Sequence, residues 1–251
     1  METLTRAQAI ELFHIAFLDV FSRRVDVSRF VLKGGANLRY FFGSIRYSED
    51  IDLDTRDLAP HLVHENVEAV LDSGPLPLLL RTRGIAVLEH TSPKLAETTQ
   101  RWKVAIAAPG LPDPVRTRIE FSARDRDGEF ELNPIPAGVV APYALRPPSV
   151  QHYAGDTPAE QKILALKGRN ETQARDVFDL DLLLRRRALP AVPLDPAILN
   201  GAASRAMELP YAAFRDQVIP FLEPDAVELY DSEEAWRQIQ TFVAEALEAA
   251  R

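Results

Sequence analysis

Residues 30–54, FVLKGGANLRYFFGSIRYSEDIDLD, constrain the fold of this chain more than any other stretch. The apolar run at 29–32 indicates a short strand, and the Gly34-Gly35 pair indicates a tight turn. Apolar positions within 36–42 favour a helix after the turn, and the alternation of 50–54 favours a second strand. The sequence therefore predicts a strand–turn–helix–strand unit.

The second strand of this unit carries two carboxylates. Strand residues two apart point to the same face, so Asp50 and Asp52 project together while Ile51 and Leu53 enter the core. Paired carboxylate oxygens are the ligands that Mg²⁺ prefers. A glycine turn that opens a helix offers backbone N–H groups to phosphate. The stretch is what a magnesium-dependent site for nucleotides needs.

The same stretch resembles a known signature. A glycine pair followed by a D-x-D strand is similar to the signature of the DNA polymerase β-like nucleotidyltransferase superfamily. The fuller string L-K-G-G-A-x-L…R-x-S-x-D-I-D-L-D resembles the AbiEii/AbiGii toxin branch, which includes the MenT toxins. Fourteen residues separate Gly35 from Asp50, a spacing usual for that branch.

The resemblance implies nucleotidyl transfer from an NTP, assisted by Mg²⁺, with two ions expected. Asp50 and Asp52 would hold the metal. Asp54 continues the alternation, but strand rise carries it away from the turn and outside the metal shell. The residues of this stretch expected to contact the nucleotide are Lys33, Gly34, Gly35 and Ser48.

A third metal carboxylate is expected from a later strand. In VRTRIEFS, residues 115–122, Arg116, Arg118 and Glu120 share one face. By the resemblance, Glu120 matches the third carboxylate of nucleotidyltransferases. The alternative is a surface ion pair with a neighbouring arginine.

A second charged segment follows further along, TPAEQKILALKGRNETQARDVFDLD, residues 157–181. Thr157 and Glu160 form a capping-box pattern for a helix on which Lys162 and Arg169 share a face. Asn170 to Thr172 break the run before a second helix. The segment resembles the second motif of the toxin branch, E-x-K…A-L-x-x-R…A-R-D-x-x-D-L.

In that branch the lysine contacts the nucleotide phosphates and the downstream aspartate is required for activity. Lys162 matches the lysine and Asp176 the first aspartate, with Asp179 one turn later. Arg169 and Asp179 are expected to contact the nucleotide as well. A structural alternative is a charged helical hairpin, because Arg175 and Asp179 have the i,i+4 spacing of an ion pair.

The remaining chain supplies the frame of a mixed α/β (α+β) fold. We expect an N-terminal helix capped by Thr5 with a structural His14 inside it, and a proline-rich connector over 133–148. Other expected elements are a helix at 61–72, strands at 76–82, 85–90 and 101–107, and helices at 195–206, 210–222 and 232–250. The expected domains are a nucleotidyltransferase lobe of twisted mixed β-sheet flanked by helices, 1–135, and a helical C-terminal lobe, 150–251, that contributes the Lys/Asp motif.

Composition limits the function classes. The 251 residues contain no cysteine, which excludes disulfides, zinc–thiolate sites and cysteine nucleophiles. No apolar run reaches the roughly 18 residues that a transmembrane helix needs, which excludes such a span, and we expect a cytoplasmic protein. The formal net charge of −8 argues against a broadly basic nucleic-acid binder but leaves room for a local cationic patch.

The resemblance favours a toxin of a type IV-like toxin–antitoxin or abortive-infection system. Its expected acceptor is RNA, with the tRNA 3′ end first by family analogy, and its expected partner is a cognate antitoxin. Ser48 is a conceivable phosphorylation point for such a partner, because added charge there would repel NTP. The alternatives are transfer to a small molecule such as an aminoglycoside or to a protein, and a catalytically silent interaction module.

Overall fold

The computed structural model describes residues 4–72, 74–96, 98–123, 128–186 and 194–250. Its packing divides into two units. The first unit comprises Met1–Phe41 and Tyr47–Tyr153, and the second comprises Phe42–Arg46 and Ala154–Arg251. The chain therefore enters the second unit once for five residues, returns, and enters it again after Tyr153.

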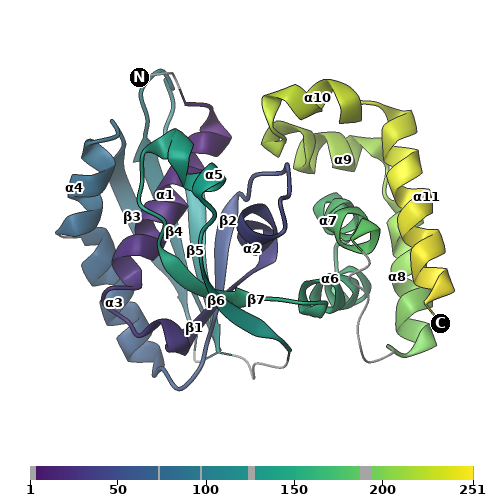
Figure 1. Cartoon of the computed structure of the whole chain (residues 1–251), viewed down its shortest axis with the longest axis horizontal. Helices are drawn as coiled ribbons and strands as arrows, with labels where there is room; N and C mark the ends of the chain where they lie inside the picture. Colours follow the sequence, from purple (N-terminus) through teal and green to yellow (C-terminus); the bar gives the residue numbers. More distant parts are fainter. Residues whose placement is uncertain (1–3, 73, 97, 124–127, 187–193, 251) are drawn as a thin grey trace. The chain divides into compact units, whose positions relative to one another are not determined.

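The first unit contains a mixed sheet and its helices (Figure 1). Its elements are α1 (Arg6–Phe21), η1 (Val27–Arg29), β1 (Phe30–Lys33), α2 (Gly34–Phe41), β2 (Asp50–Thr55), α3 (Pro60–Asp72), α4 (Pro75–Arg81), β3 (Ala86–Leu95), β4 (Thr99–Ala107), β5 (Val115–Ala123), β6 (Phe130–Pro134), α5 (Ala137–Val140), η2 (Ala141–Tyr143) and β7 (Ser149–Tyr153).

Within the described residues the sheet has seven strands in the order β3-β4-β5-β2-β1-β7-β6. The β2/β5 and β1/β7 pairs are parallel, and the others are antiparallel. The predicted α/β class, with a mixed sheet and flanking helices, is confirmed. The predicted strand–turn–helix–strand unit is β1, α2 and β2, and these strands lie next to each other in the sheet.

Helices α1, α3 and α4 cover one face of this sheet (Figure 1). The α1 helix is buried along most of its length and begins with a complete capping box between Thr5 and Gln8. Its aromatic residues continue into the sheet, where the ring centroids of Phe21 and Phe121 are 5.2 Å apart. Burial of these apolar faces holds the first unit together.

Three expectations about local structure are wrong. Residues 76–82 do not form a strand, because Pro75–Arg81 is the helix α4, with Leu76 and Leu80 buried one turn apart. The 133–148 stretch is not only a connector, since it contains parts of β6 and the helices α5 and η2. Finally, α6 is capped one residue earlier than expected, at Asp156, and without a side-chain hydrogen bond.

The second unit is helical around its own apolar core. Its helices are α6 (Thr157–Gly168), α7 (Ala174–Arg185), α8 (Pro196–Glu208), α9 (Tyr211–Gln217), η3 (Ile219–Phe221), α10 (Pro224–Tyr230) and α11 (Glu233–Ala249). Trp236, Ile239, Val243 and Leu247 form the buried stripe of α11 at helical spacing. Over the described part of the chain, no helix combines the length and the apolar character that crossing a membrane needs.

Candidate functional site

The turn between β1 and α2 strongly favours glycine at its first position. Gly34 has a φ of +67°, a conformation that strains other residues. A Cβ placed there would also lie 2.7 Å from Oδ2 of Asp52, closer than real Cβ contacts. The missing side chain therefore allows the start of α2 to lie directly against the Asp52 carboxylate.

Three carboxylates share the sheet face beside this turn. Asp50 and Asp52 are two apart on β2, and the parallel strand β5 pairs Asp52 with Glu120 in register. Neighbouring strands lie about 4.8 Å apart, so the register places Glu120 next to the D-x-D pair. The structure thus brings together the three residues that the sequence predicted as metal ligands.

Two arginines pair with two of these three carboxylates. Arg118 donates to Asp50 through Nη2 and through Nε, the latter at 2.8 Å from Oδ1. Arg101 donates from Nε to Oε2 of Glu120 at 2.8 Å. The hydrogen bond to Asp50 raises the pKa of Arg118, and the charges of Asp50, Glu49 and Asp52 add to that effect. Glu120 therefore forms the ion pair that was its alternative role, at a position next to the other carboxylates.

The hydroxyl group of Ser48 fixes the start of β2. It donates to the backbone carbonyl of Asp50 at 2.7 Å, and the residue is 9% exposed. Lys33, at the end of β1, forms an ion pair with Asp54, and the Tyr153 hydroxyl donates to the second oxygen of Asp54 at 2.9 Å. Asp54 is thus held by these two residues, and the nucleotide contacts of Lys33 and Ser48 stay predictions.

A buried histidine supports the start of β2 from the opposite face of the sheet. Nε2 of His14 lies 2.7 Å from Oγ1 of Thr117, and the Thr117 hydroxyl donates to the Glu49 carbonyl at 2.8 Å. Because that hydroxyl has one proton, His14 must donate to it from Nε2. Burial lowers the pKa of His14 to about 4, although the charge of Asp50 opposes the shift. His14 therefore has the structural place that was expected.

A pocket of about 380 Å³ opens beside Asp50 along β3, β4 and β5. Its lining includes Asp50 and the cationic residues Lys103, Arg116 and Arg118. Glu49 and Glu89 also line it, and Arg116 lies 3.6 Å from Glu89. The pocket is therefore mixed in charge, with its acidic catalytic candidate at one end of a row of cations.

The second unit gathers the charged residues of the second motif. Nζ of Lys162 lies 2.8 Å from Oδ1 of Asp176 and 2.7 Å from Oδ2 of Asp179. Arg46 donates to both oxygens of Asp179, at 3.0 and 2.8 Å. Nε of Arg169 lies 3.2 Å from Oδ2 of Asp176, outside hydrogen-bonding geometry. Both aspartates are 0% exposed, so this charge cluster is a buried one.

Opposite charges decide how these buried groups titrate. Burial by itself would raise the pKa of Asp179, but Arg46 and Lys162 outweigh it and lower that pKa to about 2. Burial likewise opposes the charge of Lys162, and Asp176 and Asp179 outweigh it, so the pKa of Lys162 is raised. Asp179 and Lys162 are therefore both charged at neutral pH.

Comparison with known proteins gives the family. A family model described as "Nucleotidyl transferase AbiEii toxin, Type IV TA system" matches residues 16–249. The chain belongs to the AbiEii family. No curated protein matches it.

Two solved structures share the AbiEii chain's fold. JHP933 from Helicobacter pylori matches with a TM-score of 0.55 and 19% identity, covering 97% of this chain and 90% of that one. A candidate nucleotidyltransferase from H. pylori matches with a TM-score of 0.56 and 18% identity, covering 96% and 91%. The identity is low enough that these matches speak for the fold alone.

Sequence reasoning missed one partner in the AbiEii chain. The sequence predicted no partner for Arg46, yet it forms the paired hydrogen bonds to Asp179. Its place in the R-x-S part of the first motif was the available signal. The motif residues thus form two groups, Asp50, Asp52 and Glu120 in the first unit and Arg46, Lys162, Asp176 and Asp179 in the second.

Proposed function

We propose that this AbiEii-family protein transfers a nucleoside monophosphate from an NTP to the 3′ end of a tRNA and thereby blocks translation. The acceptor hydroxyl oxygen bonds to the α-phosphorus, the bond to the β-phosphate bridge breaks, and pyrophosphate leaves. The hydroxyl proton passes to solvent. One observation carries the proposal: Asp50, Asp52 and Glu120 share one sheet face beside the Gly34 turn.

The donor set fits Mg²⁺, which prefers carboxylate oxygens. Asp50, Asp52 and Glu120 would hold it, and Gly34 leaves room at the Asp52 carboxylate. Bound Mg²⁺ would stabilise the negative charge that develops on the phosphates during transfer.

The protein's own cations and amides have complementary roles. The α2 N-terminus presents backbone N–H groups and a favourable dipole to a phosphate. Arg118, once released from Asp50, has the planar donor geometry that suits phosphate oxygens. The proposal also gives Lys162 the phosphate contact that the family motif implies, with Asp176 and Asp179 holding its ammonium group.

The pocket beside Asp50 supports a polyanionic acceptor. Lys103, Arg116 and Arg118 line it, and cations that follow a groove attract a phosphate backbone. A cationic acceptor such as an aminoglycoside would meet these positive charges, although Glu49, Asp50 and Glu89 line the same pocket. The type IV toxin–antitoxin description of the family implies an antitoxin partner that restrains this activity.

The experiment incubates the purified protein with Mg²⁺, each α-labelled NTP in turn, and total cellular RNA. The expected result is label in a tRNA-sized band with the wild type and none with Asp50→Asn or Asp52→Asn. The free energy of unfolding of both variants should stay within about 1 kcal/mol of the wild-type value, since both residues are only partly buried.

Other outcomes separate the parts of the proposal. Label that enters only protein or a small molecule would keep the chemistry and reject the RNA acceptor. Absence of label with every NTP, from a folded protein that also fails to bind MgNTP, would reject nucleotidyl transfer and leave an interaction module.

A further inference from the structure

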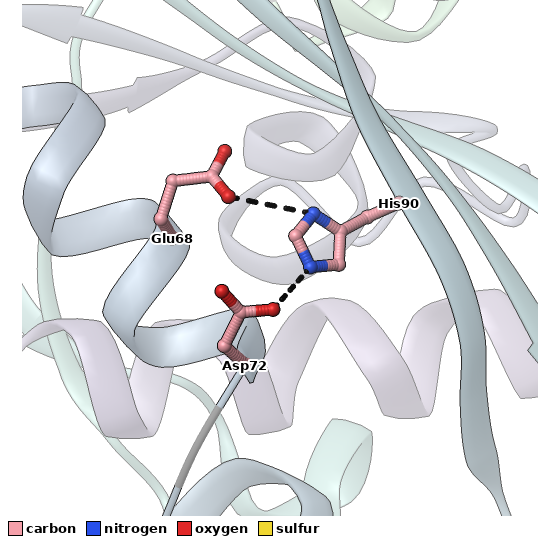
Figure 2. A group of neighbouring side chains, drawn as sticks. All are labelled: Glu68, Asp72 and His90. Atoms are coloured by element: carbon pink, nitrogen blue, oxygen red, sulfur yellow. Dashed lines mark hydrogen bonds and ion pairs between the residues drawn. The ribbon is translucent and has the colours of Figure 1, made fainter.

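Another group of metal-ligating side chains lies where α3 meets β3. Glu68 and Asp72 are four residues apart on α3, so they project from the same side of the helix, and His90 reaches them from β3 (Figure 2). One donor atom from each residue lies within 4.8 Å of the other two. The two carboxylates thus lie beside the two ring nitrogens of one imidazole.

This group lies on the helix-covered face of the sheet. His90 pairs with Val104 in the β3/β4 register, and directly paired residues share a face. Val104 is buried in the core, whereas Arg101, three residues earlier on β4, lies on the other face with Glu120. The group therefore lies on the opposite sheet face from the carboxylates of β2 and β5, and His90 also lines the pocket that opens beside Asp50.

The existing contacts already orient the donors. Nε2 of His90 lies 2.7 Å from Oδ1 of Asp72, and Nδ1 lies 3.7 Å from Oε2 of Glu68. The indole N–H of Trp102 donates to the other oxygen of Glu68 at 2.6 Å. That bond fixes the Glu68 carboxylate and turns Oε2 toward His90, which is the arrangement that outer-shell partners give to metal ligands.

A second observation concerns His64, a histidine on α3. His64 lies one turn before Glu68, and its Nδ1 is buried without a hydrogen-bond partner among the described residues. Its distance of 3.8 Å to Oε1 of Glu68 is too long for a hydrogen bond. Buried polar nitrogens are normally satisfied, and a water on a cation beside Glu68 would satisfy this one.

We propose that Glu68, Asp72 and His90 bind a divalent transition-metal ion, with Zn²⁺ the best match. An imidazole together with carboxylates suits Zn²⁺, whereas Mg²⁺ and Ca²⁺ favour sites of oxygen alone. The ion takes the place of the proton shared by His90 and Asp72, and water completes its coordination. It joins α3 to β3, the strand at one edge of the sheet.

The test titrates the full chain, stripped of metal by a chelator, with Zn²⁺ in the presence of excess Mg²⁺ that occupies the carboxylates of β2 and β5. His90→Gln and Asp72→Asn remove proposed ligands. His61→Gln and Glu65→Gln are matched controls, because both residues are exposed on the same helix. Calorimetry gives the stoichiometry and affinity, and thermal unfolding gives an independent readout.

The wild type should bind one Zn²⁺ and unfold at a higher temperature when it is bound. His90→Gln and Asp72→Asn should weaken binding at least about tenfold, and both controls and Asp50→Asn should retain it. Equal affinity in the wild type and His90→Gln, or loss of binding in Asp50→Asn alone, would overturn the assignment. So would a wild type that binds no Zn²⁺ under these conditions.

Discussion

The carboxylates of the two motifs are both paired with cations, but one set is accessible and the other is enclosed. On the strand face, Asp50 and Glu120 are 13% and 23% exposed, and the arginines that pair with them are 39% and 35% exposed. In the second unit, Asp176 and Asp179 are 0% exposed, and Lys162 is 12% exposed. Exposed ion pairs contribute little to stability and open easily, whereas breaking a buried one leaves an uncompensated charge.

The difference shows that ion pairs between carboxylates and cations can have two roles, one in a site that is open to ligands and one in holding helices together. The strand face can exchange its arginines for a ligand with little loss of stability. The buried cluster keeps α6, α7 and the 42–46 segment together, so its substitution affects folding as well as any role in the reaction. Loss of activity after substitution at Lys162 or Asp176 therefore needs a stability measurement beside it.

The largest expected effect is on stability, from Asp179→Asn. The substitution leaves Arg46 and Lys162 without the carboxylate that both contact, so the free energy of unfolding should fall by about 3–5 kcal/mol in urea titrations. The matched control is Glu234→Gln, whose ion pair with Arg237 is exposed and should change stability by less than about 0.5 kcal/mol. Similar losses in the two variants would remove the contrast between enclosed and accessible pairs.

The second expected effect is that His14 in the first unit and Asp179 in the second lose their contributions to stability in different pH ranges. His14 has a pKa of about 4 in the folded chain against 6.5 for the ordinary group, so the unfolded chain binds more protons between those values. Neutral His14 makes its full contribution to the free energy of unfolding above about pH 6.5. As the pH falls toward 4, that free energy drops by about 3 kcal/mol. Asp179, with its pKa lowered from 3.8 to about 2, loses its contribution only below pH 4.

Urea unfolding of the wild type and His14→Gln at pH 7 and pH 4.5 checks this order. The wild type should lose stability between the two values, and His14→Gln should lose much less. An equal loss in both proteins would mean that another group controls acid sensitivity in this range.

The smallest expected effect concerns metal affinity. Arg118→Gln removes the cation that competes for Asp50, so Mn²⁺, used as a probe in the absence of nucleotide, should bind up to about tenfold more tightly. Stability should change by less than about 1 kcal/mol. Arg116→Gln is the control, because it removes the same charge from an exposed position two residues away. Unchanged Mn²⁺ affinity in Arg118→Gln would show that the arginine does not occupy the metal carboxylates.

Local patterns explain why much of the first unit was predictable. The β1–α2–β2 unit follows from a glycine turn and strict alternation within 25 residues, and the shared face of Asp50 and Asp52 follows from strand geometry. In the second unit, the hairpin of α6 and α7 was equally predictable, because Asn170 to Thr172 break its helical periodicity.

Longer-range features were not predictable. An apolar run such as PLPLLL suits a strand or a buried helix, and packing of Leu76 and Leu80 in the core decides for α4. The β6 strand is exposed on both faces and shows no alternation. Arg46 and Asp179 are 133 residues apart, and no local pattern specifies such a partner.

Because Phe42–Arg46 belongs to the second unit, the two units cannot be separated by a single cut in the chain. A gene fragment that starts at Ala154 would lack Arg46, the bidentate partner of Asp179, and Ile45, whose carbonyl accepts the Glu223 amide at 2.9 Å. The helical unit is therefore not a module that recombination can move intact. The two motifs must therefore stay in one gene, because the first motif includes Arg46, which is part of the helical unit that contains the second motif.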